Sequence, residues 1–181
     1  MEDLISLVNE VPAEAHETWF GKIADLLLKK YVIQTSNGRY RLTEIEFYYH
    51  SATHADTAAY GYVDEQKKYD KRILRHKEAQ GKTMTWFFHY SGVDIVFGRA
   101  KEPGGILLRA MRNVETDELI KGPLVVMLEL LNQGVSVMGG DGMKLELVKN
   151  DKVVESKVER TTRVGIGYGG KEKEEYNYWV K

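Results

Sequence analysis

The 181-residue sequence predicts an α+β fold with a largely antiparallel sheet, because strand-like segments outnumber helical ones and short hairpin-type turns connect most of them. Hydrophobic residues make up 43% of the chain and charged residues 29%, which permits a buried core and excludes disorder as the main state. Neither an internal repeat nor a long linker divides the chain, so we expect one domain over residues 1–181.

Two helical segments are expected before the first strand. Residues 1–17 contain an apolar set followed by Pro12, which suggests a short helix and a turn. A longer helix is expected from Thr18, a residue type that caps helix N-termini. Its apolar stripe, at spacings of three and four residues, consists of Trp19, Ile23, Leu26 and Leu27.

The next segments predict a β-hairpin. Asn37-Gly38 separates two β-prone runs, residues 31–35 and 39–49, and Asn-Gly suits the positive φ angles of a tight hairpin turn. Because side chains alternate between the faces of a strand, the second run has one mainly apolar and one polar face. The apolar face holds Thr43, Ile45, Phe47 and Tyr49, and the polar face holds Glu44, Glu46 and Tyr48.

The remaining chain predicts further strands and one more clear helix. Residues 50–82 are irregular and then highly charged, with a solvated helix expected through Ile73 and Leu74. Gly122-Pro123 is expected to open a helix that Gly134 ends, with Leu124, Met127, Leu128 and Leu131 along one side. Strands are expected at residues 84–90, 92–97, 106–111, around 145–147, after Asn150-Asp151 and at 176–180, with a loop at Pro103-Gly104-Gly105.

Composition excludes several classes of protein. The absence of cysteine removes disulfide scaffolds, thiol nucleophiles, iron–sulfur clusters and cysteine-ligated zinc. The acidic N-terminus has no apolar segment after it, and no apolar run is long enough for a membrane span, so we expect a cytoplasmic protein without a membrane partner. The net charge of −1 means that a nucleic-acid partner would need a local basic patch.

The densest group of reactive side chains is Glu44, Glu46, Tyr48, His50, His54 and Asp56. In one interpretation the carboxylates are solvated and the rings pack. In a second, His50, His54 and Asp56 bind a metal, although the spacing of the two histidines suits a helix and this segment follows a strand. In a third, a carboxylate beside aromatic rings acts as a general base, which suits hydrolysis at a sugar carbon.

Five segments, in order, resemble the alkyladenine (3-methyladenine) DNA glycosylases. They cover residues 16–180 and are the helix from Thr18-Trp19-Phe20, the strand Arg41 to Tyr48, Gly105-Ile106-Leu107-Leu108-Arg109-Ala110, Lys121-Gly122-Pro123, and Arg163 to Tyr168 followed by Tyr176 to Val180. The resemblance implies a compact mixed fold with a curved antiparallel sheet. It also implies hydrolysis of the N-glycosidic bond of a damaged base, with no cofactor and no metal.

The resemblance also implies roles for individual residues. Glu46 takes the place of the glutamate that activates water, and Tyr48, His54, Trp86 and Asp94 fall around the base-binding pocket. His89, Tyr90 and Arg109 are the candidates for contact with DNA. A base must leave the duplex before such chemistry, and flat side chains hold it once it has. This interpretation requires Glu46 to project into a hollow walled by aromatic rings.

The sequence departs from the family pattern at three places. No basic Thr-x-Arg-Asn loop follows the glutamate, the hairpin that would carry a wedge residue is shorter, and Asp94 stands where the family has Asn. Basic residues that could still contact DNA are Lys67, Lys68, Lys71, Arg72, Arg75 and Arg109. We therefore keep an alternative that uses the same aromatic pocket without binding duplex DNA: a binding protein for nucleosides or purines, or an enzyme that acts on free nucleosides or modified small molecules. In either case we expect a monomer.

Overall fold

The computed structural model describes residues 2–62, 82–99, 101–134, 142–150, 152–167 and 170–181. These residues form the helices α1 (Glu2–Asn9), α2 (His16–Lys30) and α4 (Pro123–Leu131). Their strands are β1 (Tyr31–Thr35), β2 (Arg39–Tyr49), β3 (Trp86–His89), β4 (Gly92–Arg99), β5 (Glu102–Asn113), β6 (Leu119–Lys121), β7 (Leu145–Lys149), β8 (Glu159–Thr161) and β9 (Asn177–Trp179). The α+β class is confirmed.

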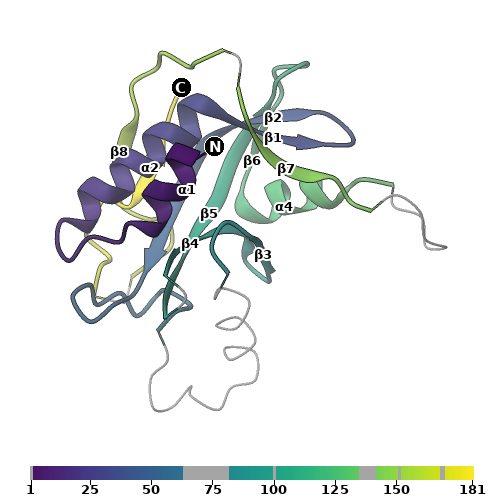
Figure 1. The fold of residues 1–181 in the computed structure, drawn as a ribbon. Coiled ribbons are helices and arrows are strands. Elements are labelled where there is room, and N and C mark those ends of the chain that lie inside the picture. The colour runs from purple at the N-terminus through teal and green to yellow at the C-terminus, as the bar shows by residue number, and fades with distance from the viewer. Residues whose placement is uncertain (1, 63–81, 100, 135–141, 151, 168–169) are drawn as a thin grey trace.

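The strands belong to one antiparallel sheet that curls into a half-barrel. Its main path is β3-β4-β5-β2-β1-β7, while β6 pairs with β5, and β9 pairs with both β2 and β8. The curl brings the two ends of this path together, since the indole N–H of Trp86 in β3 donates to the Leu145 carbonyl oxygen in β7 at 3.0 Å. Helices α1 and α2 lie side by side, and α4 lies apart from them beside β5 (Figure 1).

The core lies between α2 and the apolar face of β2. Ile45, Phe47 and Tyr49 are fully buried, as their alternation predicts, and Phe20 of α2 stacks on Phe47 with ring centroids 4.7 Å apart. The opposite face of β2 is therefore left for Glu44, Glu46 and Tyr48.

Helix α2 begins earlier than the sequence suggests. It starts at His16, with Ala15 in the left-handed conformation at the N-cap and no side-chain cap. The prediction of Thr18 as the capping residue is wrong, because its backbone N–H already donates to the Ala15 carbonyl at 3.0 Å. The three extra helical residues, 16–18, include His16, which is buried in the core.

The loop expected at Pro103-Gly104-Gly105 is instead the start of β5. Gly104 is required there for space, since a Cβ atom on it would lie 2.3 Å from a ring carbon of Phe97 on the neighbouring strand. A glycine that signals a turn in the sequence here permits close packing within a sheet.

Two further expectations differ from the structure. Helix α4 opens at Pro123 as predicted but ends at Leu131, and it buries Val126 and Leu130 while Leu124, Leu128 and Leu131 face outward. The strand expected after Asn150-Asp151 begins only at Glu159, as β8, and it pairs with β9. The helix expected through Ile73 and Leu74, and the basic residues between 67 and 75, lie outside the described residues.

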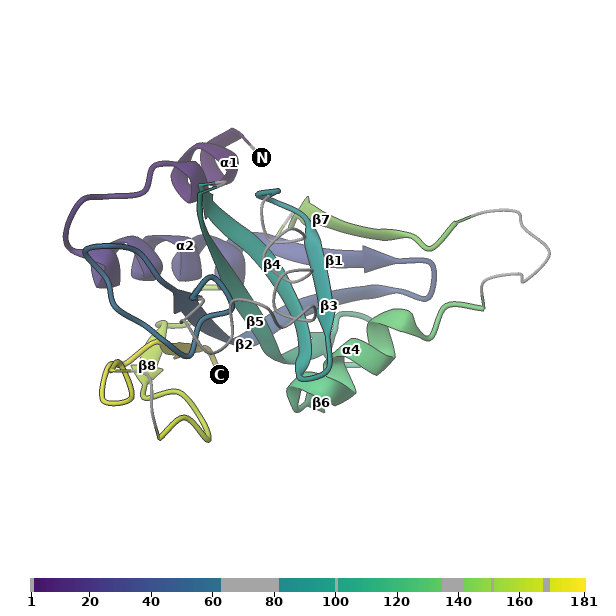
Figure 2. The same cartoon turned by 90° about the horizontal axis from the view of Figure 1, so that it is seen from below.

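The view from below shows how separate parts of the chain reach β2 (Figure 2). Strands β3, β4 and β5 follow one another across the sheet, and the C-terminal segment returns to β2 through β9. In the part of the chain that the structure describes, no helix is long and apolar enough to cross a membrane.

Candidate active site

The polar face of β2 presents Glu46 to two neighbouring strands. Glu46 lies opposite Leu107 of β5 and Asn177 of β9, and it is fully buried. A buried carboxylate needs hydrogen-bond donors, because a carboxylate removed from water without such partners destabilises the fold by roughly several kcal/mol. The surrounding segments supply those donors.

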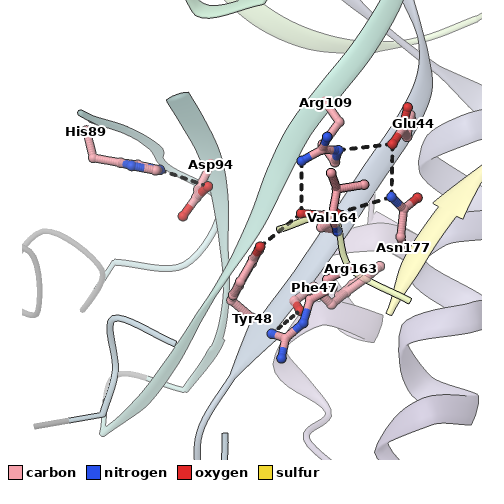
Figure 3. Close-up of polar contacts among 10 residues, drawn as sticks. Glu44, Phe47, Tyr48, His89, Asp94, Arg109, Arg163, Val164 and Asn177 are labelled. Atoms are coloured by element: carbon pink, nitrogen blue, oxygen red, sulfur yellow. Dashed lines mark hydrogen bonds and ion pairs between the residues drawn. The ribbon is translucent and has the colours of Figure 1, made fainter. Parts of the chain in front are cut away.

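Each oxygen of the Glu46 carboxylate accepts two hydrogen bonds. Oε1 accepts from the Val164 backbone N–H at 2.7 Å and from the Asn177 side-chain amide at 3.1 Å. Oε2 accepts from the Tyr48 hydroxyl at 2.9 Å and from Nη1 of Arg109 at 3.3 Å. Figure 3 shows the residues that donate these bonds converging from β2, β5 and the C-terminal segment.

Arg109 serves two carboxylates at once. Its Nε donates to Oε1 of Glu44 at 3.0 Å, and the same Glu44 oxygen accepts from the Asn177 amide at 2.9 Å. The guanidinium is thus balanced by Glu44 and Glu46, and its side chain is largely buried. The structure therefore places this DNA-contact candidate in the wall of the site, where its charge is already paired.

Tyr48 is fixed between an anion and a cation. Burial, followed by the charge of Glu46 and the hydrogen bond to it, raises the pKa of the Tyr48 hydroxyl, so the phenol stays protonated and donates. The guanidinium carbon of Arg163 lies 4.6 Å from the ring centroid. One face of the ring is therefore occupied by Arg163 and is closed to a ligand.

Arg163 is itself held by a buried ion pair. Its two terminal nitrogens donate to Asp56 at 2.7 and 3.2 Å, and both side chains are fully buried. One of the same nitrogens also donates to the Phe47 carbonyl oxygen at 3.3 Å. Because Val164 follows Arg163 directly, this pair also fixes the backbone N–H that binds Glu46.

A cavity of about 270 Å³ lies in front of this cluster. This volume is near the lower end of the roughly 300–1,000 Å³ common for small-molecule sites. Its wall includes three residues that donate to Glu46, namely Tyr48, Arg109 and Val164, together with Ala58, Tyr60, His89, Tyr90, Ser91, Asp94, Leu107, Pro123 and Ile166. We expected Glu46 to project into a hollow, but Glu46 does not line the cavity. Its carboxylate lies directly behind the cavity wall.

The β3–β4 hairpin brings three of the predicted residues to this cavity. His89 Nε2 lies 3.1 Å from Oδ1 of Asp94, and both side chains are buried (Figure 3). Tyr90, at the turn, is 78% exposed and also lines the cavity. A buried polar pair and an exposed ring thus lie at the same entrance.

Trp86 and His54 are placed away from this cavity. Trp86 lies on the opposite face of β3 from His89 and lines a separate cavity with Ile95, Leu145 and other residues. His54 is in the core, where its Nε2 lies 3.0 Å from the Tyr176 hydroxyl and its ring meets His16 at 4.8 Å. Tyr60, which the sequence pattern did not single out, supplies a ring in place of Trp86.

The three residues considered as metal ligands have other partners. Asp56 pairs with Arg163, His54 contacts Tyr176, and His50 Nδ1 lies 3.2 Å from the Asp56 backbone oxygen. Among the described residues, no group of three His, Asp or Glu side chains could hold a metal ion. The geometry therefore gives the metal interpretation no support.

The buried histidine pair predicts sensitivity to acid. Burial, with the nearby His16 second, lowers the pKa of His54 from 6.5 to about 4, and burial also lowers the pKa of His16. Since the unfolded chain binds these protons more readily, the free energy of unfolding should fall as pH drops from about 6.5 towards 4. The loss from His54 should reach about 3 kcal/mol at the low end.

Urea unfolding at several pH values measures this effect. The variant His54→Gln keeps a polar side chain but does not titrate, so its stability should depend less on pH across that range. An identical slope for the native protein and the variant would contradict the assignment to His54.

The fold and the site define a class: a mixed α+β protein whose curled sheet holds a buried glutamate behind a ring-lined pocket. The chain belongs to the family described as Methylpurine-DNA glycosylase (MPG), whose sequence pattern matches residues 16–181. It is also similar to an uncharacterised protein of Acanthamoeba polyphaga mimivirus, with 28% identity over 166 residues, covering 82% of this chain and 74% of that protein. Membership of this family confirms the resemblance drawn from the sequence.

Proposed function

We propose that this protein is a DNA glycosylase that hydrolyses the N-glycosidic bond of alkylated or otherwise damaged purines, with Glu46 as the general base. The single observation that carries the proposal is the position of the Glu46 carboxylate directly behind a pocket wall made by its own donors, Tyr48, Arg109 and Val164. The family of the chain supports the same class of substrate.

The proposed reaction uses the pocket for the base and the carboxylate for water. The damaged base leaves the duplex and packs against Tyr48 in the cavity wall. A water oxygen bonds to the sugar C1′ as the bond from C1′ to the base nitrogen breaks, and Glu46 takes the water proton. The electron pair of the broken bond leaves with the base nitrogen, so a cationic alkylated purine departs as a neutral molecule. Because both Glu46 oxygens already accept two hydrogen bonds, the water must replace one of these donors to reach the carboxylate.

Release of free bases from methylated duplex DNA tests this proposal. Chromatography should detect methylated purines after incubation with the native protein well above the slow spontaneous release found with heat-denatured protein. If the folded native protein at high concentration releases no more base than the heat-denatured control, the proposal is wrong.

The saturated carboxylate favours one alternative, a binding protein for purines or nucleosides. Glu46 is fully buried, and Arg109 is already neutralised by Glu44 and Glu46 instead of facing a phosphate. Binding to duplex DNA at low salt separates the two functions. Tight binding that weakens steeply with added salt supports the glycosylase, and purine binding without any duplex binding supports the alternative.

Tyr90 is the residue that we expect to enter the duplex. It is exposed at the β3–β4 turn beside the pocket, so Tyr90→Ala should lower duplex affinity by about tenfold and leave stability unchanged. Fluorescence anisotropy with a labelled duplex measures the affinity. The exposed Val153, which does not line this pocket, provides a control in Val153→Ala. Equal affinities of the two variants would contradict a wedge role for Tyr90.

A further inference from the structure

The pocket wall opposite Tyr48 contains a carboxylate whose hydrogen-bonding role is fixed by its neighbour. Asp94 of β4 lines the pocket, and its side chain is 4% exposed. Its Oδ1 lies 3.1 Å from Nε2 of His89 on the adjacent strand. The mechanism proposed above uses neither side chain.

The proton on His89 can be located from the other side of the ring. The Ser91 backbone N–H donates to Nδ1 of His89 at 3.2 Å, and the Tyr60 hydroxyl lies 3.3 Å from the same nitrogen. A backbone N–H can only donate, so Nδ1 is an acceptor and carries no proton. The ring proton is therefore on Nε2, which donates to Asp94.

This arrangement leaves one acceptor for a ligand. Oδ1 of Asp94 accepts the hydrogen bond from His89 Nε2–H, while the second carboxylate oxygen takes no part in that bond (Figure 3). An ionised carboxylate has no proton to donate, so this position can only accept a hydrogen bond. His89 cannot turn its donor towards the pocket without breaking its contacts with Asp94, Ser91 and Tyr60.

We propose that Asp94, held by His89, determines the specificity of this pocket by selecting purine bases that present an N–H donor and rejecting bases that present only an acceptor there. The inference rests on the proposed function for the class of ligand, a purine base. A ligand without a donor would leave the buried Asp94 oxygen unpaired. The binding free energy lost in that case is larger than the binding free energy gained from one good hydrogen bond to the right ligand.

Three small purines provide the test, because their N9 is blocked where the sugar would be attached. The probe 9-methyladenine has an amino group as its only donor, 9-methylpurine has no donor, and 6-methoxy-9-methylpurine has an added acceptor oxygen. Isothermal titration calorimetry should show that the native protein binds 9-methyladenine at least about tenfold more tightly than either of the others.

The variant Asp94→Asn should invert this order. The His89 Nε2–H needs an acceptor, so it should hold the oxygen of the new amide and leave the NH₂ group facing the pocket. The variant should then bind 6-methoxy-9-methylpurine more tightly than 9-methyladenine. Adding His89→Phe keeps a ring in this position but frees the amide to rotate, and this double variant should lose the inverted preference.

Circular dichroism melting checks that each variant is folded before titration. Equal binding of the three purines by the native protein, no binding of any of them, or an unchanged order in Asp94→Asn would overturn the inference. Base release is measured on the same proteins. Native selectivity without base release would refute the glycosylase and leave the selectivity standing, whereas base release without selectivity would overturn this inference alone.

Discussion

The variant Glu46→Gln should lose at least about 100-fold of the rate of base release, because an amide cannot take a proton from water. It should still bind a 9-methylated purine or a duplex with near-native affinity, since Glu46 lies behind the pocket wall and does not line it. A loss of rate without a loss of binding separates a chemical role from a loss of folded protein. Single-turnover release from a methylated duplex measures the rate.

The same variant should also be less stable. All four partners of the carboxylate donate hydrogen bonds, so the NH₂ group of the amide would face two donors with none to accept from it. We expect a loss of about 1–3 kcal/mol in the free energy of unfolding. Circular dichroism at the assay temperature shows whether the variant remains folded.

Glu44→Gln is the matched control. Glu44 lies on the same face of β2 and also binds Arg109 and Asn177, but it has no contact with Tyr48 or Val164 among the hydrogen bonds described. Its variant should keep base release within about tenfold of the native rate. Full activity in Glu46→Gln, or an equal loss in both variants, would remove Glu46 as the base.

The largest effect on stability is expected for Arg163→Met. Asp56 is fully buried and would lose the guanidinium that binds both of its oxygens, and the Phe47 carbonyl would lose a donor. Breaking a buried pair by removing one partner typically costs about 3–5 kcal/mol. Urea unfolding at neutral pH should show a loss of this size.

Arg160→Met is the control for this prediction. Arg160 also pairs with two carboxylates, Glu17 and Glu175, but all three side chains are about half exposed. Exposed ion pairs contribute roughly 0–1 kcal/mol, so this variant should remain near native stability. In addition, Asp56→Asn combined with Arg163→Met should recover part of the loss, since the buried charge is then removed. Similar stability of Arg160→Met and Arg163→Met would contradict the assigned importance of the buried pair.

Local alternation was sufficient to predict the two faces of β2. Apolar residues at every second position define a buried face, so Glu44, Glu46 and Tyr48 had to share the other face. The hairpin at Asn37-Gly38 forms, although φ is positive at Gly38 and not at Asn37, and the Pro123 helix start follows from the preference of proline for the first helical turn. The ordered motifs gave the family as well, which the match over residues 16–181 confirms.

The surroundings of Glu46 could not be predicted in this way. Three of its donors, Arg109, Val164 and Asn177, are between 63 and 131 residues away in the sequence. Arg109 and Asn177 reach Glu46 because β5 and β9 both pair with β2, and Val164 reaches it because the Arg163–Asp56 pair holds the adjoining residue. The motif from Arg163 to Tyr168 hinted that this segment mattered, but its spacing said nothing about a backbone N–H on the carboxylate.

The sequence by itself determined which residues are polar, which are aromatic and which alternate, and from these the strand faces and the family. Only the tertiary structure decided that Trp86 faces a different cavity from His89, that His54 lies in the core, and that Glu46 lies behind the pocket instead of in it. The physical reason is the sequence distance over which each effect acts. Backbone preferences act between neighbours in the chain, whereas the shape of a cavity depends on how far the sheet curls and on which distant strands the sheet brings together.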